Sequence, residues 1–81
     1  MNIHWTTRAA RDYDFLGHEL QRHVDKQLDY LAANLRHPSL NAKKYDEARN
    51  VWQGRVTRDY RFYFSIEGET YLILAIRKHP K

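Results

Sequence analysis

Trp52 to Ile66, WQGRVTRDYRFYFSI, is the segment around which we expect the rest of the chain to be arranged. Its second half carries large apolar side chains on alternate positions, namely Tyr60, Phe62, Phe64 and Ile66. In a β-strand, alternation of this kind places all of them on one face, against a core. In the first half, Trp52 and Val56 share a face, and a polar break follows at residues 57–59. Two alternating runs separated by a short polar break predict a β-hairpin.

A third alternating run, Thr70 to Arg77, follows a turn at Gly68, where glycine supplies a positive φ angle without steric strain. The alternation predicts that one face carries Leu72, Leu74 and Ile76, and that the other carries Ile73, Ala75, Arg77 and His79. We expect the first set to cover the same core as the hairpin. The opposite, open face of one antiparallel sheet would then carry Arg55, Arg61, Arg77 and His79.

The first half of the chain predicts a short strand and two helices. Ile3 and Trp5 have the spacing of a strand, and Thr6 or Thr7 offers a side-chain oxygen that can cap the first helix. We expect Gly17 to separate this helix from the second.

The second helix is predicted over residues 18–35, because apolar residues recur there at spacings of three and four. They are Leu20, Val24, Leu28, Leu31 and Leu35. Pro38 is expected to end the helix, since the residue before a proline is disfavoured in the helical region. The polar stretch from Ser39 to Ala48 is predicted to be a loop or an irregular approach to the hairpin.

Length and composition predict a single domain over residues 1–81 with one small core. The chain has no cysteine, and its first residues lack the pattern of a signal peptide, so we expect a cytoplasmic protein. Its longest apolar run is too short to cross a bilayer. Five histidines are present, but none is spaced from another like a pair of metal ligands with a third nearby, so no metal site is predicted.

The formal net charge is +4, from 14 Lys and Arg against 10 Asp and Glu. A basic surface on so small a chain favours an anionic partner such as RNA, DNA or an acidic protein. Mildly basic small domains without any nucleic-acid role are also common, so the charge alone does not select a function.

Three segments resemble the motifs of one known family: Trp52–Val56, Asp59–Arg61 and Ile76–His79. Their order after a strand and two helices is similar to that of the RelE/ParE superfamily of toxins from type II toxin-antitoxin systems. The resemblance covers nearly the whole chain. It implies an α+β fold in which a strand and a two-helix hairpin precede a three-stranded antiparallel sheet, in the order β-α-α-β-β-β. It also implies that a cognate antitoxin is the partner. The toxin would then contact DNA only indirectly, through the antitoxin.

The resemblance leaves the molecular target open, because the superfamily has two branches. Members similar to RelE cut messenger RNA, usually on the ribosome, whereas members similar to ParE poison DNA gyrase and have no nuclease activity. A degenerate, non-toxic relative that only binds its partner is a third alternative. The basic residues of this sequence favour the nuclease branch, whose partners are the ribosome and messenger RNA and whose chemistry requires no cofactor.

Cleavage of RNA by its own 2′-hydroxyl requires a base, an acid and cations that stabilise charge on the phosphate. Arg61 matches the arginine that follows Asp-Tyr in the family, and its planar guanidinium would bind the scissile phosphate. His79 matches the terminal histidine of several nuclease members, and imidazole, with an unperturbed pKa of about 6.5, serves as acid or base near neutral pH. Arg55 would stabilise the phosphate as well. We therefore expect His79, Arg61 and Arg55 to be catalytic.

A second set of residues is expected to hold RNA through charge or stacking. It consists of Arg77, Lys78, Arg58, Tyr63, Lys43 and Lys44. Each of three residues also has an interpretation without a function. Arg61 could be a solvated charge on a strand, and His79 could be an ordinary residue of the C-terminal tail. Tyr63 could simply pack against a residue of the neighbouring strand.

Two departures from the family pattern bear on the catalytic hypothesis. Some nuclease members carry a pair of lysines on the second strand, where this sequence has Gln53 and Arg55. Those members also carry a tyrosine on a C-terminal helix, whereas this sequence ends at Lys81. If the base is usually drawn from those groups, either His79 has to do more of the proton transfer here or the activity is weak.

Overall fold

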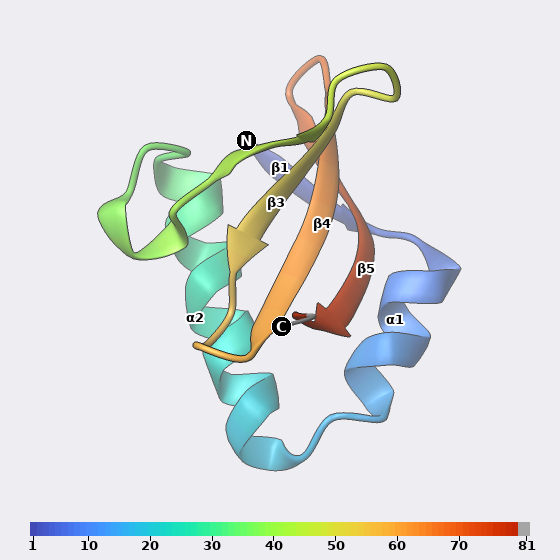
Figure 1. Cartoon of the computed structure of the whole chain (residues 1–81), viewed down its shortest axis with the longest axis vertical. Coiled ribbons are helices and arrows are strands. Elements are labelled where there is room, and N and C mark those ends of the chain that lie inside the picture. The colour runs from blue at the N-terminus through green and yellow to red at the C-terminus, as the bar shows by residue number, and fades with distance from the viewer. Residues whose placement is uncertain (80–81) are drawn as a thin grey trace.

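The computed structural model describes residues 1–79, which form one five-stranded sheet with two α-helices and a short 3-10 helix, η1. Figure 1 shows α2 across one face of the sheet and α1 beside β5. In chain order the elements are β1 (Asn2–Trp5), α1 (Thr7–Asp14), α2 (His18–Ala33), η1 (Pro38–Leu40), β2 (Lys43–Asp46), β3 (Val51–Arg55), β4 (Tyr60–Glu67) and β5 (Thr70–Lys78).

The strand order in the sheet is β1-β5-β4-β3-β2. β1 runs parallel to β5, and every other neighbouring pair is antiparallel. The predicted α+β class and the order of a strand, two helices and an antiparallel sheet are confirmed. The predicted number of strands is wrong, because β2 is a fourth antiparallel strand beside the three expected ones, and β1 joins the same sheet.

The prediction of a loop over residues 39–48 is wrong, because this segment contains η1 and the edge strand β2. Lys43 pairs with Gln53 and Lys44 pairs with Trp52. A strand at the edge of a sheet needs only one paired side and often carries lysines, which discourage further pairing. Lys43–Asp46 therefore forms a strand without the apolar alternation that marks a strand in a sequence.

The predicted hairpin of β3 and β4 is confirmed, with its turn at residues 57–59. The backbone N–H groups of Val56 and Thr57 donate to the Tyr60 carbonyl oxygen, at 3.0 and 3.3 Å. Phe62 and Phe64 are fully buried, as the alternation predicts. The hairpin thus supplies the centre of the core.

The predicted faces of β5 are wrong for its first half. Tyr71 and Ile73 are buried in the core, whereas Leu72 and Leu74 are only partly buried. Ile73 pairs with Phe64 and Ala75 pairs with Tyr63, so Leu74 is an extra residue opposite no partner. Such a β-bulge shifts the alternation by one residue. Beyond the bulge Ile76 faces the core and Ala75 and Arg77 face the other side, as predicted.

The helix α1 closes the edge of β5 where β1 ends. Thr6 caps the helix, since its hydroxyl oxygen accepts a hydrogen bond from the Ala9 N–H at 3.2 Å, and the same hydroxyl donates to the Ile73 carbonyl oxygen at 2.7 Å. The Asp12 carboxylate accepts a hydrogen bond from the Ile76 N–H at 3.0 Å. Side chains of this kind satisfy polar groups on the side of β5 that β1 leaves unpaired, which holds α1 beside the open face.

The helix α2 packs its apolar stripe on the other face of the sheet. Val24, Leu28 and Leu31 are buried, as the spacing predicts. The helix ends at Ala33, two residues earlier than expected, because Asn34 is extended and its N–H closes the last turn on the Tyr30 carbonyl. Within residues 1–79, no helix has both the length and the apolar character needed to cross a membrane.

A glycine on β3 makes room for the largest side chain of the core. Gly54 pairs with Phe62, and both lie on the core side of the sheet. A Cβ atom added at position 54 would lie 2.5 Å from Cζ of Phe62. The phenyl ring therefore occupies the space that any other residue at position 54 would fill.

We predict that Gly54→Ala lowers the free energy of unfolding by about 1–3 kcal/mol, because the buried ring has to shift out of a well-packed position. Urea denaturation measures the change. Gly17→Ala is the matched control, since no heavy atom lies within 4 Å of its added Cβ, and it should change the stability by less than about 1 kcal/mol. Equal effects of the two substitutions would show that the ring does not depend on the glycine.

Candidate functional site

Three arginines line up across the open face, at the end of the strands next to the β3–β4 turn. Arg55 on β3 pairs with Arg61 on β4, which pairs with Arg77 on β5. Residues directly opposite each other in a sheet point to the same side, and neighbouring strands lie about 4.8 Å apart. The arginine row, Arg55–Arg61–Arg77, thus lies on the face opposite Phe62, as the alternation predicts.

A buried glutamine of α2 holds the Arg55 end of this row. Gln27 is only 5% exposed, and its Nε2 donates to the carbonyl oxygens of Arg55 at 2.9 Å and Ser39 at 3.1 Å. The Ser39 hydroxyl donates back to Gln27 Oε1 at 3.3 Å. Because buried amides lose free energy when they are left unpaired, this network ties the end of β3 firmly to α2.

Arg61 differs from its two neighbours, because its guanidinium is folded onto its own hairpin turn. Its Nη1 donates to the carbonyl oxygens of Thr57 at 2.6 Å, Tyr60 at 2.9 Å and Arg58 at 3.2 Å. A guanidinium has five N–H donors, so Nε and Nη2 remain for a ligand. Arg61 stabilises the turn and also presents a cation to the open face.

His79 extends the antiparallel ladder of β4 and β5. Its backbone N–H donates to the Asp59 carbonyl oxygen at 2.6 Å, one position beyond the pair of Tyr60 with Lys78. Because side chains alternate along a strand, His79 lies on the same side of the sheet as Arg77. The residue is exposed to solvent. The proposed role of this imidazole in catalysis stays a prediction.

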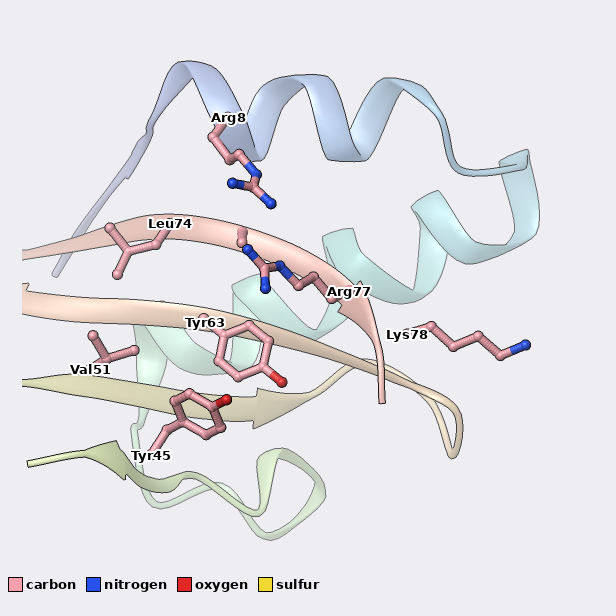
Figure 2. Close-up of a pocket in the computed structure, with 8 residues that line it drawn as sticks. Arg8, Tyr45, Val51, Tyr63, Leu74, Arg77 and Lys78 are labelled. Atoms are coloured by element: carbon pink, nitrogen blue, oxygen red, sulfur yellow. The ribbon is translucent and has the colours of Figure 1, made fainter. Parts of the chain in front are cut away.

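Beside the arginine row, the open face is hollowed into a groove of about 460 Å³. Figure 2 shows Arg8 of α1 directed toward it from one side and Tyr45 of β2 on the other, with Tyr63 between them. The residues that line the groove are Arg8, Tyr45, Val51, Tyr63, Leu74, Ala75, Arg77 and Lys78. Its surface therefore combines aromatic rings with cations.

The two tyrosines of the groove contact each other edge to face, with ring centroids 4.9 Å apart and planes at 62°. Burial raises the pKa of the Tyr63 hydroxyl, and the neighbouring Tyr45 adds to this, while Arg77 and Arg61 oppose it. The net direction is upward, so Tyr63 keeps its proton at neutral pH. It is a hydrogen-bond donor and a stacking surface there, but not a base.

The cations of the groove have few partners of their own. Within residues 1–79, the Arg77 side chain makes no hydrogen bond or ion pair. The Arg8 guanidinium is 3.9 Å from Asp12, whose same oxygen, Oδ2, accepts a hydrogen bond from the Ile76 N–H. Because that carboxylate already binds the backbone and the pair is long, both arginines are available to an anion.

Lys44 lies away from the open face, although it was expected to bind RNA. It pairs with Trp52, whose side chain packs against the core on the opposite face. Its Nζ donates to Asn50 Oδ1 at 2.6 Å, lies 3.9 Å from Glu47 and sits 5.4 Å from the centre of the Trp52 ring. These contacts hold the Lys44 side chain beside β2 and β3, away from the arginine row.

The other predicted cations lie at the margins of the site. Lys43 pairs with Gln53 and therefore shares the side of Tyr63. Arg58 is exposed in the hairpin turn. Lys78 pairs with Tyr60, one position out of step with Arg77, and its side chain points away from the other lining residues in Figure 2.

Arg8 and Tyr45 are lining residues that the sequence did not single out. Arg8 enters the site because the parallel pairing of β1 with β5 brings α1 to the open face, and no local pattern encodes such a pairing. For Tyr45 there was a weak signal: it is an aromatic residue among the cations Lys43, Lys44 and Arg49.

One family model matches residues 3–81, nearly the whole chain. It is described as the ParE toxin of the type II toxin-antitoxin system, parDE. No curated protein matches the sequence.

Several solved structures share the fold at low sequence identity. The YoeB/ParE toxin from Agrobacterium tumefaciens is 16% identical with a TM-score of 0.84, and the match covers 99% of this chain and 100% of that one. A chain of the YoeB-YefM complex from Staphylococcus aureus is 14% identical with a TM-score of 0.80, over 99% and 98%. A chain of the intact E. coli RelBE toxin-antitoxin complex is 14% identical with a TM-score of 0.77, also over 99% and 98%.

We predict that Arg61→Ala destabilises the protein by about 1–2 kcal/mol, because it leaves three carbonyl oxygens of the turn without their charged donor. Arg77→Ala, at the neighbouring position of the same row, should change the stability by less than about 0.5 kcal/mol. Urea denaturation of both variants provides the comparison. If the two arginines prove equally dispensable for folding, the turn does not depend on Arg61.

Proposed function

The chain belongs to the family of ParE toxins of type II toxin-antitoxin systems, and from this premise we propose that it is a ribosome-dependent endoribonuclease that cuts messenger RNA. The family lies within the RelE/ParE superfamily that the sequence resembles. The observation that carries the proposal is the arginine row beside an aromatic groove on one open face. Such a face fits a phosphate backbone and its bases.

The proposed reaction is an internal transfer at phosphorus. The 2′-oxygen of one nucleotide attacks the adjacent phosphorus and the 5′-oxygen of the next nucleotide leaves, which gives a 2′,3′-cyclic phosphate and a free 5′-hydroxyl. The 2′-hydroxyl gives up one proton to solvent water, and the 5′-oxygen gains one proton from an acid. The step requires no metal or external co-reactant.

Arg77 and Arg55 are the groups that we assign to the phosphate. Their side chains have no polar partner among residues 1–79, so a phosphate can take their donors without competition. A guanidinium stabilises the negative charge that builds on the phosphate oxygens more strongly at the transition state than before it. Arg61 adds its remaining donors from the centre of the row.

His79 is the group that we assign to proton transfer. It follows Arg77 by two residues on the same side of the β5 ladder, which supports a role beside the Arg77 end of the arginine row. Tyr63 keeps its own proton at neutral pH and is therefore no candidate for the base. With the 5′-oxygen as the leaving group, His79 would act as the acid that protonates it.

A cognate antitoxin is the expected regulator of this site. The structures named above include complexes of toxins with antitoxins, which supports a partner of this kind for the chain. An acidic segment laid over the open face would neutralise the arginine row and exclude RNA. Binding of that kind weakens as salt increases.

Poisoning of DNA gyrase is the second candidate function, and one observation favours it. The matching family model is described as the ParE toxin, and ParE-like members of the superfamily act on gyrase without nuclease activity. In that case the open face would bind protein, and His79 would have no chemical role.

We predict that the protein creates new 5′ ends in a messenger RNA translated in a reconstituted system, and that omission of ribosomes abolishes them. His79→Ala should slow cleavage by about 10²–10⁴-fold, the range for loss of a general acid. Arg77→Ala should slow it by about 10²–10³-fold, the range for loss of a charge-stabilising donor. Arg22→Gln, an exposed cation on α2, is the control and should have no effect.

Full cleavage by both the His79 and the Arg77 variants would refute this assignment of the site. The absence of new ends with folded wild-type protein would refute the nuclease itself. Inhibition of supercoiling by purified gyrase in the same preparation would then establish the second candidate, and inactivity in both assays would indicate a non-toxic relative that binds only its partner.

A further inference from the structure

The groove beside the arginine row is lined by aromatic rings as well as cations, whereas a phosphate requires only the cations. Its volume of about 460 Å³ falls in the range of about 300–1,000 Å³ that is usual for small-molecule sites. Aromatic and aliphatic side chains share its lining with two arginines, one on α1 and one on β5. This combination suits a ligand with both a flat ring and a negative charge.

Tyr45 supplies an aromatic surface that is open to solvent. It is 63% exposed, one of three large apolar side chains so exposed among residues 1–79. The register of β2 shifts between Lys44 and Asp46, so Tyr45 sits on an irregularity of the edge strand, where such shifts re-aim a side chain. The Tyr63 ring holds it edge to face, which leaves a ring face available for stacking.

Arg8 supplies a cation from the opposite wall. It lies in the first turn of α1, its side chain is 61% exposed, and it is directed toward Arg77 in Figure 2. The carboxylate of its ion-pair partner, Asp12, accepts a hydrogen bond from the backbone of β5. Arg8 and Arg77 thus face the groove from two different elements.

We propose that this groove is a nucleotide-binding subsite. The nucleobase stacks on Tyr45, the Tyr63 hydroxyl donates a hydrogen bond to the edge of the base, and Arg8 binds a phosphate next to the one at Arg77. An acidic peptide would use the arginines but not the ring face, so the pairing of stacking surface with cations favours a nucleotide. The identification of the nucleotide as part of RNA rests on the proposed function.

Titration of the isotope-labelled full chain with ribonucleoside 5′-monophosphates, followed by NMR, tests the subsite without any cleavage. Ribose 5-phosphate, which has the charge and the sugar but no base, is the comparison ligand. We expect shifts of the Tyr63 and Ala75 amide signals with the nucleotides. Ribose 5-phosphate should bind at least about fivefold more weakly, since stacking strengthens binding of each base by this much or more.

Two variants, each with a matched control, distinguish the contribution of the Tyr45 ring from that of the Arg8 charge. Tyr45→Leu should reduce nucleotide affinity to that of ribose 5-phosphate, whereas Phe15→Leu, at an aromatic residue that is 90% exposed outside the groove, should leave it unchanged. Arg8→Gln should weaken both ligands, whereas Arg22→Gln should weaken neither. All four positions are exposed, so folding should be retained, and the amide spectrum verifies it.

The subsite is refuted if millimolar nucleotide leaves the groove signals unshifted, or if Tyr45→Leu or Arg8→Gln binds nucleotide like the wild type. These results are independent of the cleavage assay. Nucleotide binding in a protein that cuts no RNA would sustain the subsite and refute the nuclease. Ribosome-dependent cleavage by a protein that binds no nucleotide in the groove would support the nuclease and refute the subsite.

Discussion

Phe62 packs into the space beside Gly54, and this contact fixes how β3 pairs with β4. The buried ring fills the space of the missing side chain, so β3 and β4 pair in the register that sets these two residues opposite each other. Side chains alternate between the faces of a sheet, and a slip by one residue would exchange them. The same register that buries Phe62 therefore presents Arg55 and Arg61 on the open face, with Arg77 added by β5.

Two irregularities convert this sheet into a site. The bulge at Leu74 allows β5 to bury Tyr71 and Ile73 in its first half and still direct Arg77 to the open face in its second. The register shift in β2 falls at Tyr45, which forms one wall of the groove. Local departures from regular pairing of this kind are common beside functional sites. Here they join an apolar core on one face to a cationic, aromatic surface on the other.

The alternation in residues 52–66 was sufficient to predict the hairpin, its core face and the side of its arginines, because one face is strongly apolar and the other is not. The faces of β5 could not be predicted in the same way, since residues 71–76 are apolar at every position and an extra residue leaves no trace in such a run. The strand β2 and the residue Arg8 depend on tertiary pairing, and the contacts of Arg61 with its own turn depend on side-chain geometry. No local pattern records these.

We assign the messenger RNA to the open face of the sheet and not to the helical face. An electron cryo-microscopy structure of the protein on ribosomes programmed with a message blocked by 2′-O-methyl groups tests it directly, because the blocked RNA cannot be cut. We expect phosphates within hydrogen-bond distance of Arg55 and Arg77 and a base stacked on Tyr45. A complex in which α2 faces the message and the arginine row faces solvent, or the absence of any complex, would contradict it.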